Sequence, residues 1–138
     1  MAHLHPYIFS NDAKSQAEFY VKALGGEIFL SRSFADTPGD VDEAIKDKIF
    51  HLRLRAAGQV FYMSDLMEES VNRGNGLDLV LEFEDVEETR KVFNGLAEGG
   101  NVLMDFEKQV WGNFSGMVQD QFGVRWQIAT IDTDFAHT

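Results

Sequence analysis

Cysteine is absent from the 138-residue chain. Its absence excludes a thiolate nucleophile, a cysteine-ligated zinc ion and an iron–sulfur cluster, and it removes the usual sign of a small secreted domain held by disulfides. Basic residues are also scarce, since 12 Lys and Arg stand against 23 Asp and Glu and give a formal net charge of −11. This charge repels the phosphates of nucleic acids and of anionic membrane surfaces. We therefore expect a cytoplasmic protein that binds neither nucleic acid nor membrane.

Long apolar runs are missing as well. No segment approaches the ~20 consecutive apolar residues that a membrane-spanning helix requires. Residues 1–6 contain no basic stretch followed by an apolar run, so we expect neither an anchor nor a targeting signal. The hydrophobic content is nevertheless 44%, with 12 Phe, which is too high for a disordered chain and predicts a packed core. The length matches one ordinary domain.

The alternation of apolar and polar residues predicts a strand, a helix and three strands, followed by the same order again. In the first half the expected elements are a strand over residues 4–9, a helix from an N-cap at 10–12 to glycines at 25–26, and strands over 27–34, 50–55 and 59–64. In the second half they are a strand over 77–84, a helix from Asp85 to glycines at 99–100, and strands over 102–111, 113–119 and 125–131. Residues 35–48 are expected to form a loop with a short helical turn, and residues 65–76 a polar, glycine-rich connector.

Matching positions in the two halves indicate an internal repeat. The residues Phe19, Ala23, Gly25 and Gly26 lie 74 positions before Phe93, Ala97, Gly99 and Gly100. The expected helix caps, Asp12 and Asp85, are 73 positions apart. Because caps, helix lengths, paired glycines and strands all repeat in order, we predict an α+β fold of two βαβββ modules, at about 3–65 and 77–131, within a single domain of residues 1–138.

Two stretches of the sequence resemble one known superfamily. The first contains His5-Pro6-Tyr7-Ile8-Phe9, Ala17-Glu18-Phe19-Tyr20 and Leu24-Gly25-Gly26, and the second contains Trp111-Gly112, Gly116, Asp120-Gln121-Phe122-Gly123 and Trp126. Together with His51, Arg53 and Met63-Ser64-Asp65, these residues are similar to those of PhnB-like proteins in the vicinal-oxygen-chelate superfamily, which includes glyoxalases, bleomycin resistance proteins and dioxygenases. The resemblance covers about residues 3–130. One departure is Gln121 in place of the usual proline, which changes the rigidity of a turn rather than the chemistry.

The resemblance implies a curved mixed sheet that cups a divalent metal, with ligands from the first and last strand of each module. Carried onto this chain, the ligand positions are His5, Tyr62, Asp78 and Gln127, and the alternation places them opposite the helix-packing residues Leu4, Phe61, Leu79 and Ile128. Only His5 and Asp78 are strong donors, because Gln127 is neutral and Tyr62 would have to lose its proton. We therefore expect His5, Asp78 and Gln127 to form a weak metal site, with a divalent metal as the only cofactor in question.

Three side chains are candidates for proton transfer. Glu82 shares the strand face of Asp78, and His51 shares a face with Arg53 and Arg55, so Asp78, Glu82 and His51 are the expected acids or bases of an enzyme. The alternative interpretation of His51 is a partly buried histidine that is satisfied by a neighbouring carboxylate, and the alternative for the two arginines is ordinary ion pairing.

A small-molecule pocket is the other expectation. The candidate ligand-binding residues are His5, Tyr7, Phe9, Arg53, Tyr62, Trp111, Met117 and Gln127. Aromatic walls stack on planar or apolar ligands, and an arginine clamps an anion. We find no phosphate-binding glycine loop, nucleophilic triad or nucleotide fingerprint in the sequence.

Two functions follow from these residues. In the first, the chain binds a small molecule in a cavity between paired modules without chemistry, as bleomycin-binding members of the superfamily do. In the second, a metal polarises a substrate oxygen while Glu82 or Asp78 moves a proton, as in a lyase, isomerase or dioxygenase. The incomplete donor set favours the first. The resemblance also implies a homodimer, because its members build their cups from paired modules and residues 65–76 would permit exchange between subunits.

Overall fold

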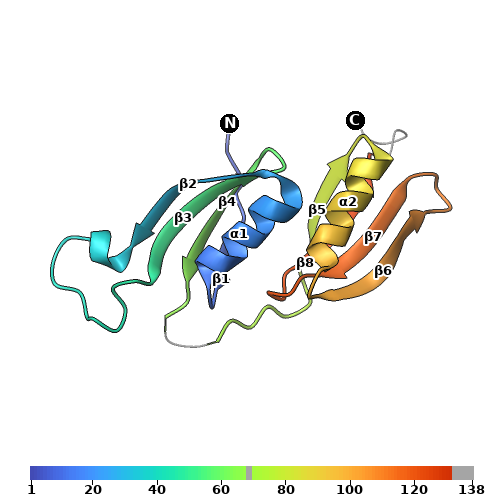
Figure 1. The fold of residues 1–138 in the computed structure, drawn as a ribbon. Coiled ribbons are helices and arrows are strands. Elements are labelled where there is room, and N and C mark those ends of the chain that lie inside the picture. The colour runs from blue at the N-terminus through green and yellow to red at the C-terminus, as the bar shows by residue number, and fades with distance from the viewer. Residues whose placement is uncertain (68–69, 132–138) are drawn as a thin grey trace. The chain divides into compact units, whose positions relative to one another are not determined.

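In the described residues, each half of the sequence forms one α-helix and one four-stranded mixed sheet (Figure 1). The computed structural model describes residues 1–67 and 70–131. The chain divides into a first unit, Met1–Asn72, and a second unit, Arg73–Thr138. The predicted α+β class with two βαβββ modules is confirmed, and neither sheet is closed. That the two units make one domain stays a prediction.

The first unit places four strands in the order β1-β4-β3-β2. Its elements are β1 (Tyr7–Ser10), α1 (Ala13–Leu24), β2 (Gly26–Ser33), the short 3-10 helix η1 (Phe34–Asp36), β3 (Ile49–Ala56) and β4 (Gln59–Asp65). β1 is parallel to β4, and the other two pairs are antiparallel. The carboxylate of Asp12 caps α1, as predicted, by accepting a hydrogen bond from the N–H of Ser15 at 3.2 Å, a cap that contributes about 1 kcal/mol.

Helix α1 covers one face of this sheet, and we call the face that α1 does not cover the open face. It buries Ala13, Ala17 and Tyr20 against the strands, and the strand residues that meet it are Leu52, Leu54, Phe61 and Met63. Because side chains alternate along a strand, the neighbours of these residues must project from the opposite face. The candidate residues of β1, β3 and β4 lie on that face.

The second unit repeats this plan, with the strand order β5-β8-β7-β6. Its elements are β5 (Leu79–Phe83), α2 (Val86–Ala97), β6 (Asn101–Lys108), β7 (Phe114–Gln119) and β8 (Arg125–Thr130). β5 is parallel to β8, as β1 is to β4. Helix α2 is capped by Asp85, whose carboxylate accepts a hydrogen bond from the N–H of Glu88 at 2.7 Å. The buried core between α2 and the sheet consists of Val92, Phe93, Leu96, Val118, Trp126 and Ile128.

Asp120 organises the turn between β7 and β8 from a buried position. Its Oδ1 accepts hydrogen bonds from the N–H groups of Phe122 at 2.8 Å and Val124 at 3.1 Å. Its Oδ2 accepts a hydrogen bond from the indole N–H of Trp126 at 2.9 Å. The stretch 120–123, which contributed strongly to the resemblance, therefore has a structural role. The carboxylate of Asp120 accepts hydrogen bonds from protein groups of this turn.

Gly26 and Gly100 stand at matching places in the repeat, where the chain enters the strand after each helix. A Cβ atom on Gly26 would overlap the carbonyl oxygen of Arg55, and one on Gly100 would overlap that of Gln119. The obstacle is backbone in both cases. Only glycine fits where two chain segments approach this closely.

Several predicted boundaries need correction. The first strand begins at Tyr7 rather than at residue 4, and Leu4 is 96% exposed, so it does not pack against the helix. The sixth strand ends at Lys108, so Trp111 lies in the following turn and not in a strand. β7 begins at Phe114 and pairs with β6 as far as Lys108, so no partner strand runs beside Trp111. Residues 4–6 do lie alongside β4, but Pro6 has no N–H to donate to a strand ladder, and the strand begins only after it.

Asp65 belongs to β4 and not to the connector where the sequence placed it. Its carboxylate accepts hydrogen bonds from the N–H of Ala13 at 2.8 Å and from the N–H of Ile49 at 2.7 Å, which ties the start of α1 to the start of β3. Residues 68 and 69 of the predicted connector lie outside the described residues. Among residues 1–67 and 70–131, no helix has the length and apolar character needed to cross a membrane.

Candidate functional site

The open face of the first sheet carries a cluster of aromatic, histidine and arginine side chains. We call it the aromatic face, and its members are His5, Tyr7, Phe9, His51, Arg53 and Tyr62. Tyr7 pairs with Tyr62 across β1 and β4, and Tyr62 pairs with Arg53 across β4 and β3. Side chains opposite one another on the same sheet face are direct neighbours. Five of the eight predicted ligand-binding residues therefore lie together. His51, a predicted proton-transfer residue, lies beside them.

Tyr62 is the centre of the aromatic face. The ring of His5 stacks on it at a centroid distance of 4.7 Å. The guanidinium carbon of Arg53 lies 4.4 Å from the centroid of the same ring, a cation–π contact. Since His5 precedes β1 and Arg53 lies on β3, the two approach Tyr62 from the strands on either side of β4. These two contacts restrict the orientation of the Tyr62 ring.

His51 links Tyr7 to Arg53. The Nε–H of Arg53 donates a hydrogen bond to Nε2 of His51 at 3.0 Å, and Nδ1 of His51 lies 3.3 Å from the hydroxyl oxygen of Tyr7. Burial, and secondly the positive charge of Arg53, lower the pKa of His51 below its ordinary value. The interpretation of His51 as a histidine satisfied by a carboxylate is therefore wrong, because its partners are a phenol and a guanidinium.

Tyr7 and Phe9 are the exposed aromatic residues of this face, at 44% and 48% exposure. Their ring centroids are 5.1 Å apart, and both lie on β1 at the edge of the sheet. Ile8, between them in sequence, points the other way and is buried. Half-exposed aromatic rings on a sheet are a natural contact for a planar ligand.

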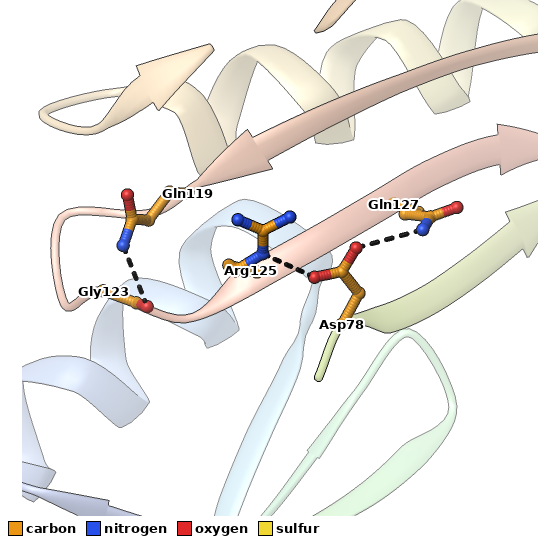
Figure 2. A network of polar contacts seen from close by, with 5 residues as sticks. All are labelled: Asp78, Gln119, Gly123, Arg125 and Gln127. Atoms are coloured by element: carbon orange, nitrogen blue, oxygen red, sulfur yellow. Dashed lines mark hydrogen bonds and ion pairs between the residues drawn. The ribbon is translucent and has the colours of Figure 1, made fainter. Parts of the chain in front are cut away.

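The second unit holds a different cluster, made by Asp78 just before β5 and by Arg125 and Gln127 on β8 (Figure 2). The fifth strand begins at Leu79 rather than at residue 77 as predicted. Oδ1 of Asp78 accepts a hydrogen bond from the Nε–H of Arg125 at 2.7 Å, and Oδ2 accepts one from the amide of Gln127 at 3.0 Å. The hydrogen bond from Arg125, and then that from Gln127, lower the pKa of Asp78 below its ordinary value. The carboxylate is therefore ionised and already satisfied. Beside this cluster, the amide of Gln119 donates a hydrogen bond to the carbonyl of Gly123 at 3.4 Å.

The remaining predicted residues of the second unit do not join one cluster. Met117 on β7 is the cross-strand neighbour of Gln127. Glu82 is exposed on β5, where it pairs with Ala129. Trp111 is 55% exposed in the turn after β6. Asp78 and Gln127 are thus brought together, whereas Glu82 is hydrogen-bonded to neither of them.

The donor chemistry of Asp78 does not fit a metal ligand. A divalent ion is held by carboxylate lone pairs whose charge is free to offset its lost hydration. Here both carboxylate oxygens accept hydrogen bonds, and the guanidinium of Arg125 offsets the charge. Within residues 1–67 and 70–131, no group of three or more His, Asp or Glu side chains is placed to hold a metal ion.

Two side-chain hydrogen bonds of the candidate site were not predicted from the sequence. The first is the bond between Arg53 and His51, although the two residues stand two apart on one strand and so share a face. The second is the pairing of Arg125 with Asp78, which required knowing that β5 lies beside β8. Strand alternation could have identified the first contact, whereas the second depends on a parallel pairing across the whole module.

We expect Asp78→Asn to lower the free energy of unfolding by about 2 kcal/mol at pH 7, because the substitution leaves the partly buried Arg125 without its counter-charge. The folded-state pKa of Asp78 is depressed, so the stabilisation is complete above the unfolded value of about 3.9 and is lost as the pH falls through the folded value. Urea unfolding at pH 7 and pH 3 measures both effects. Glu82→Gln removes an exposed carboxylate on β5, four residues after Asp78, and is the control. An equal loss in the control would contradict the prediction.

Comparisons with known proteins agree with this architecture. The family model described as 3-demethylubiquinone-9 3-methyltransferase matches residues 3–129. Protein YjdN of Escherichia coli is 30% identical over 139 residues, which cover 93% of this chain and 95% of that protein. The crystal structure of protein PA1353 from Pseudomonas aeruginosa superposes with a TM-score of 0.82 at 30% identity, covering 94% of this chain and 98% of that one.

More distant structures share the fold. A protein from Bacillus cereus described as a putative 3-demethylubiquinone-9 3-methyltransferase, PhnB protein, gives a TM-score of 0.75 at 22% identity, covering 94% of this chain and 99% of that one. The fosfomycin resistance protein FosX of Listeria monocytogenes, in complex with Mn(II) and sulfate, gives 0.65 at 12% identity, covering 94% and 91%. The fold of this chain is thus shared with more distant structures such as that of FosX. The chain belongs to the PhnB-like family described as 3-demethylubiquinone-9 3-methyltransferase.

Proposed function

We propose that this protein is a cytoplasmic small-molecule binding protein that uses the aromatic face of its first unit and needs no tightly held metal. The observation that carries the proposal is the exposure of Tyr7 and Phe9 beside Tyr62, whose ring is fixed by His5 and Arg53. Exposed aromatic rings on a rigid sheet offer a stacking surface at low entropic cost. The metal-free part of the proposal rests on Asp78, whose lone pairs serve Arg125 and Gln127.

Native mass spectrometry of freshly purified protein, combined with elemental analysis, is the first experiment. We expect substoichiometric metal and, where a ligand has co-purified, a mass that corresponds to an organic molecule. The same spectrum counts subunits and so tests the homodimer that the family resemblance implies. The competing function is a metal-dependent lyase, isomerase or dioxygenase. A stoichiometric metal whose binding is lost in both His5→Ala and Asp78→Ala would overturn the metal-free proposal in its favour.

Phe9→Ala tests the stacking surface. We expect the variant to bind aromatic fragments about tenfold more weakly, which corresponds to roughly 1.4 kcal/mol, because it loses one of the two exposed rings of the face. The measurement is a titration followed by amide chemical shifts, with fragments of different charge. Phe29→Ala is the matched control, since Phe29 is 43% exposed and lies on β2, at the opposite edge of the same sheet. Equal losses in the two variants, or fragments that shift no residue of the aromatic face, would refute the proposed function.

A further inference from the structure

Arg53 is a half-buried cation on the aromatic face. In the part of the chain that the structure describes, its hydrogen bond goes to the neutral ring of His51, and it forms no ion pair with a carboxylate. Arg55, two residues later on the same strand, lies 3.6 Å from the carboxylate of Glu27. A half-buried guanidinium that lacks a counter-charge has given up hydration without receiving an anion in return.

The hydrogen bond from Arg53 also determines which nitrogen of His51 carries the proton. A guanidinium N–H can only donate, so Nε2 of His51 must accept and carry no proton. The neutral ring then bears its proton on Nδ1 and donates it to the hydroxyl oxygen of Tyr7. Since that oxygen already accepts, the hydroxyl proton of Tyr7 is left to donate elsewhere. The chain from Arg53 through His51 to Tyr7 therefore has donors at both ends.

Both ends of this chain are open toward a ligand. Only Nε of Arg53 is engaged by a described residue, so its two terminal nitrogens remain as donors. Tyr7 is half-exposed on the same sheet face, with its ring beside that of Phe9. The lowered pKa of His51 keeps the ring neutral near pH 7, which preserves the direction of the chain. Donors next to an exposed aromatic surface are complementary to an acceptor that is attached to a planar body.

We propose that the aromatic face selects organic oxyanions that carry a planar apolar group, with the oxyanion held by Arg53 and the hydroxyl of Tyr7 and the planar group on Tyr7 and Phe9. This inference rests on the proposed function and narrows it to a class of ligand. The net charge of −11 opposes an anion at long range, but salt screens charges beyond about 8 Å at physiological ionic strength, so the contacting guanidinium dominates. Arginine is suited to the task because its terminal nitrogens form paired hydrogen bonds with two oxygens of one group.

The experiment compares probes that share a phenyl ring and differ in the charge of the attached group. Benzoate, phenylphosphonate, benzamide and benzylammonium are titrated into the whole chain in a low-chloride buffer without phosphate, and amide chemical shifts are followed. We expect the two anions to bind at least tenfold more tightly than benzamide, and benzylammonium to bind most weakly. Equal affinities for benzoate and benzamide would overturn the oxyanion proposal while leaving the proposed function intact. Binding by none of the four at the aromatic face would overturn both.

Three variants assign the roles. Arg53→Gln is expected to abolish the preference for the two anions over benzamide. Arg55→Gln makes the same change of charge on the same strand and should retain the preference, so an equal loss there would show that general charge and not the site is responsible. Tyr7→Phe keeps the ring and removes the hydroxyl, and it should weaken both anions three- to tenfold. The nitrogen shifts of His51 report the tautomer directly, and a proton on Nε2 would contradict the proposed chain.

Discussion

Replacing Asp120 with alanine is expected to lower the free energy of unfolding by about 4 kcal/mol, because three donors lose their acceptor in a buried turn. The carboxylate receives the N–H groups of Phe122 and Val124 and the indole N–H of Trp126. Each buried donor that is left unsatisfied costs about 1–3 kcal/mol, and the three costs overlap because the turn relaxes. Such a loss is a large part of the stability of an ordinary domain.

Urea unfolding measures this loss, with intrinsic tryptophan fluorescence as the probe because the ring of Trp126 is buried beside Asp120. Asp105→Ala provides the control, since Asp105 is an exposed aspartate on β6 of the same unit. Asp120→Asn should be less harmful than Asp120→Ala, because an amide oxygen still accepts some of the three bonds. A loss below about 1 kcal/mol in Asp120→Ala would show that the turn is held by other contacts.

Gly26→Ala and Gly100→Ala are each expected to destabilise the protein by about 3 kcal/mol. The added methyl group meets a carbonyl oxygen of the neighbouring segment, so the backbone itself must shift in both units. At Gly26 a φ of 156° adds to the difficulty, since side chains rarely adopt it. The two variants test the same device at matching positions of the repeat.

Gly76→Ala is the control for both substitutions. Gly76 is not in the left-handed region, and a Cβ there would meet no heavy atom within 4 Å. The substitution should be neutral or slightly stabilising, because alanine restricts the unfolded chain. Thermal unfolding of the three variants gives the comparison. If Gly26→Ala and Gly76→Ala melted together, the close approach of the two backbone segments at Gly26 would not exist in solution.

The order of elements was predictable because each signal is local. The caps Asp12 and Asp85 use their own next turn, and strand alternation depends only on neighbouring residues. Strand ends were less predictable, since a strand ends where its partner ends. Trp111 lies beyond the start of β7, the partner of β6. Leu4 lies before Pro6, which has no N–H for a strand ladder, so the first strand begins only at Tyr7.

The site was predictable to the same extent. Alternation correctly grouped Tyr7 with Phe9, and Arg53 with His51, because it requires only one strand at a time. The contacts that decide the chemistry join different strands, and they depend on side-chain rotamers as well as on register. Asp78 was therefore considered a metal ligand, although Arg125 occupies its lone pair from the adjacent strand.

The parallel pairing of β1 with β4 has a consequence for the order in which the first unit is built. The hairpin of β3 and β4 closes through two residues, since Ala56 pairs with Gln59, whereas Tyr7 must find Tyr62 across 55 positions of the chain. Short hairpins form in about 1–10 microseconds, and pairings of high contact order are slower because a long loop must first be closed. Arg53 and Tyr62 therefore come together early on the hairpin, and Tyr7 and Phe9 arrive with the edge strand that closes the sheet. We therefore expect the surface that we assign to the ligand to be the last part of the first unit to be completed during folding.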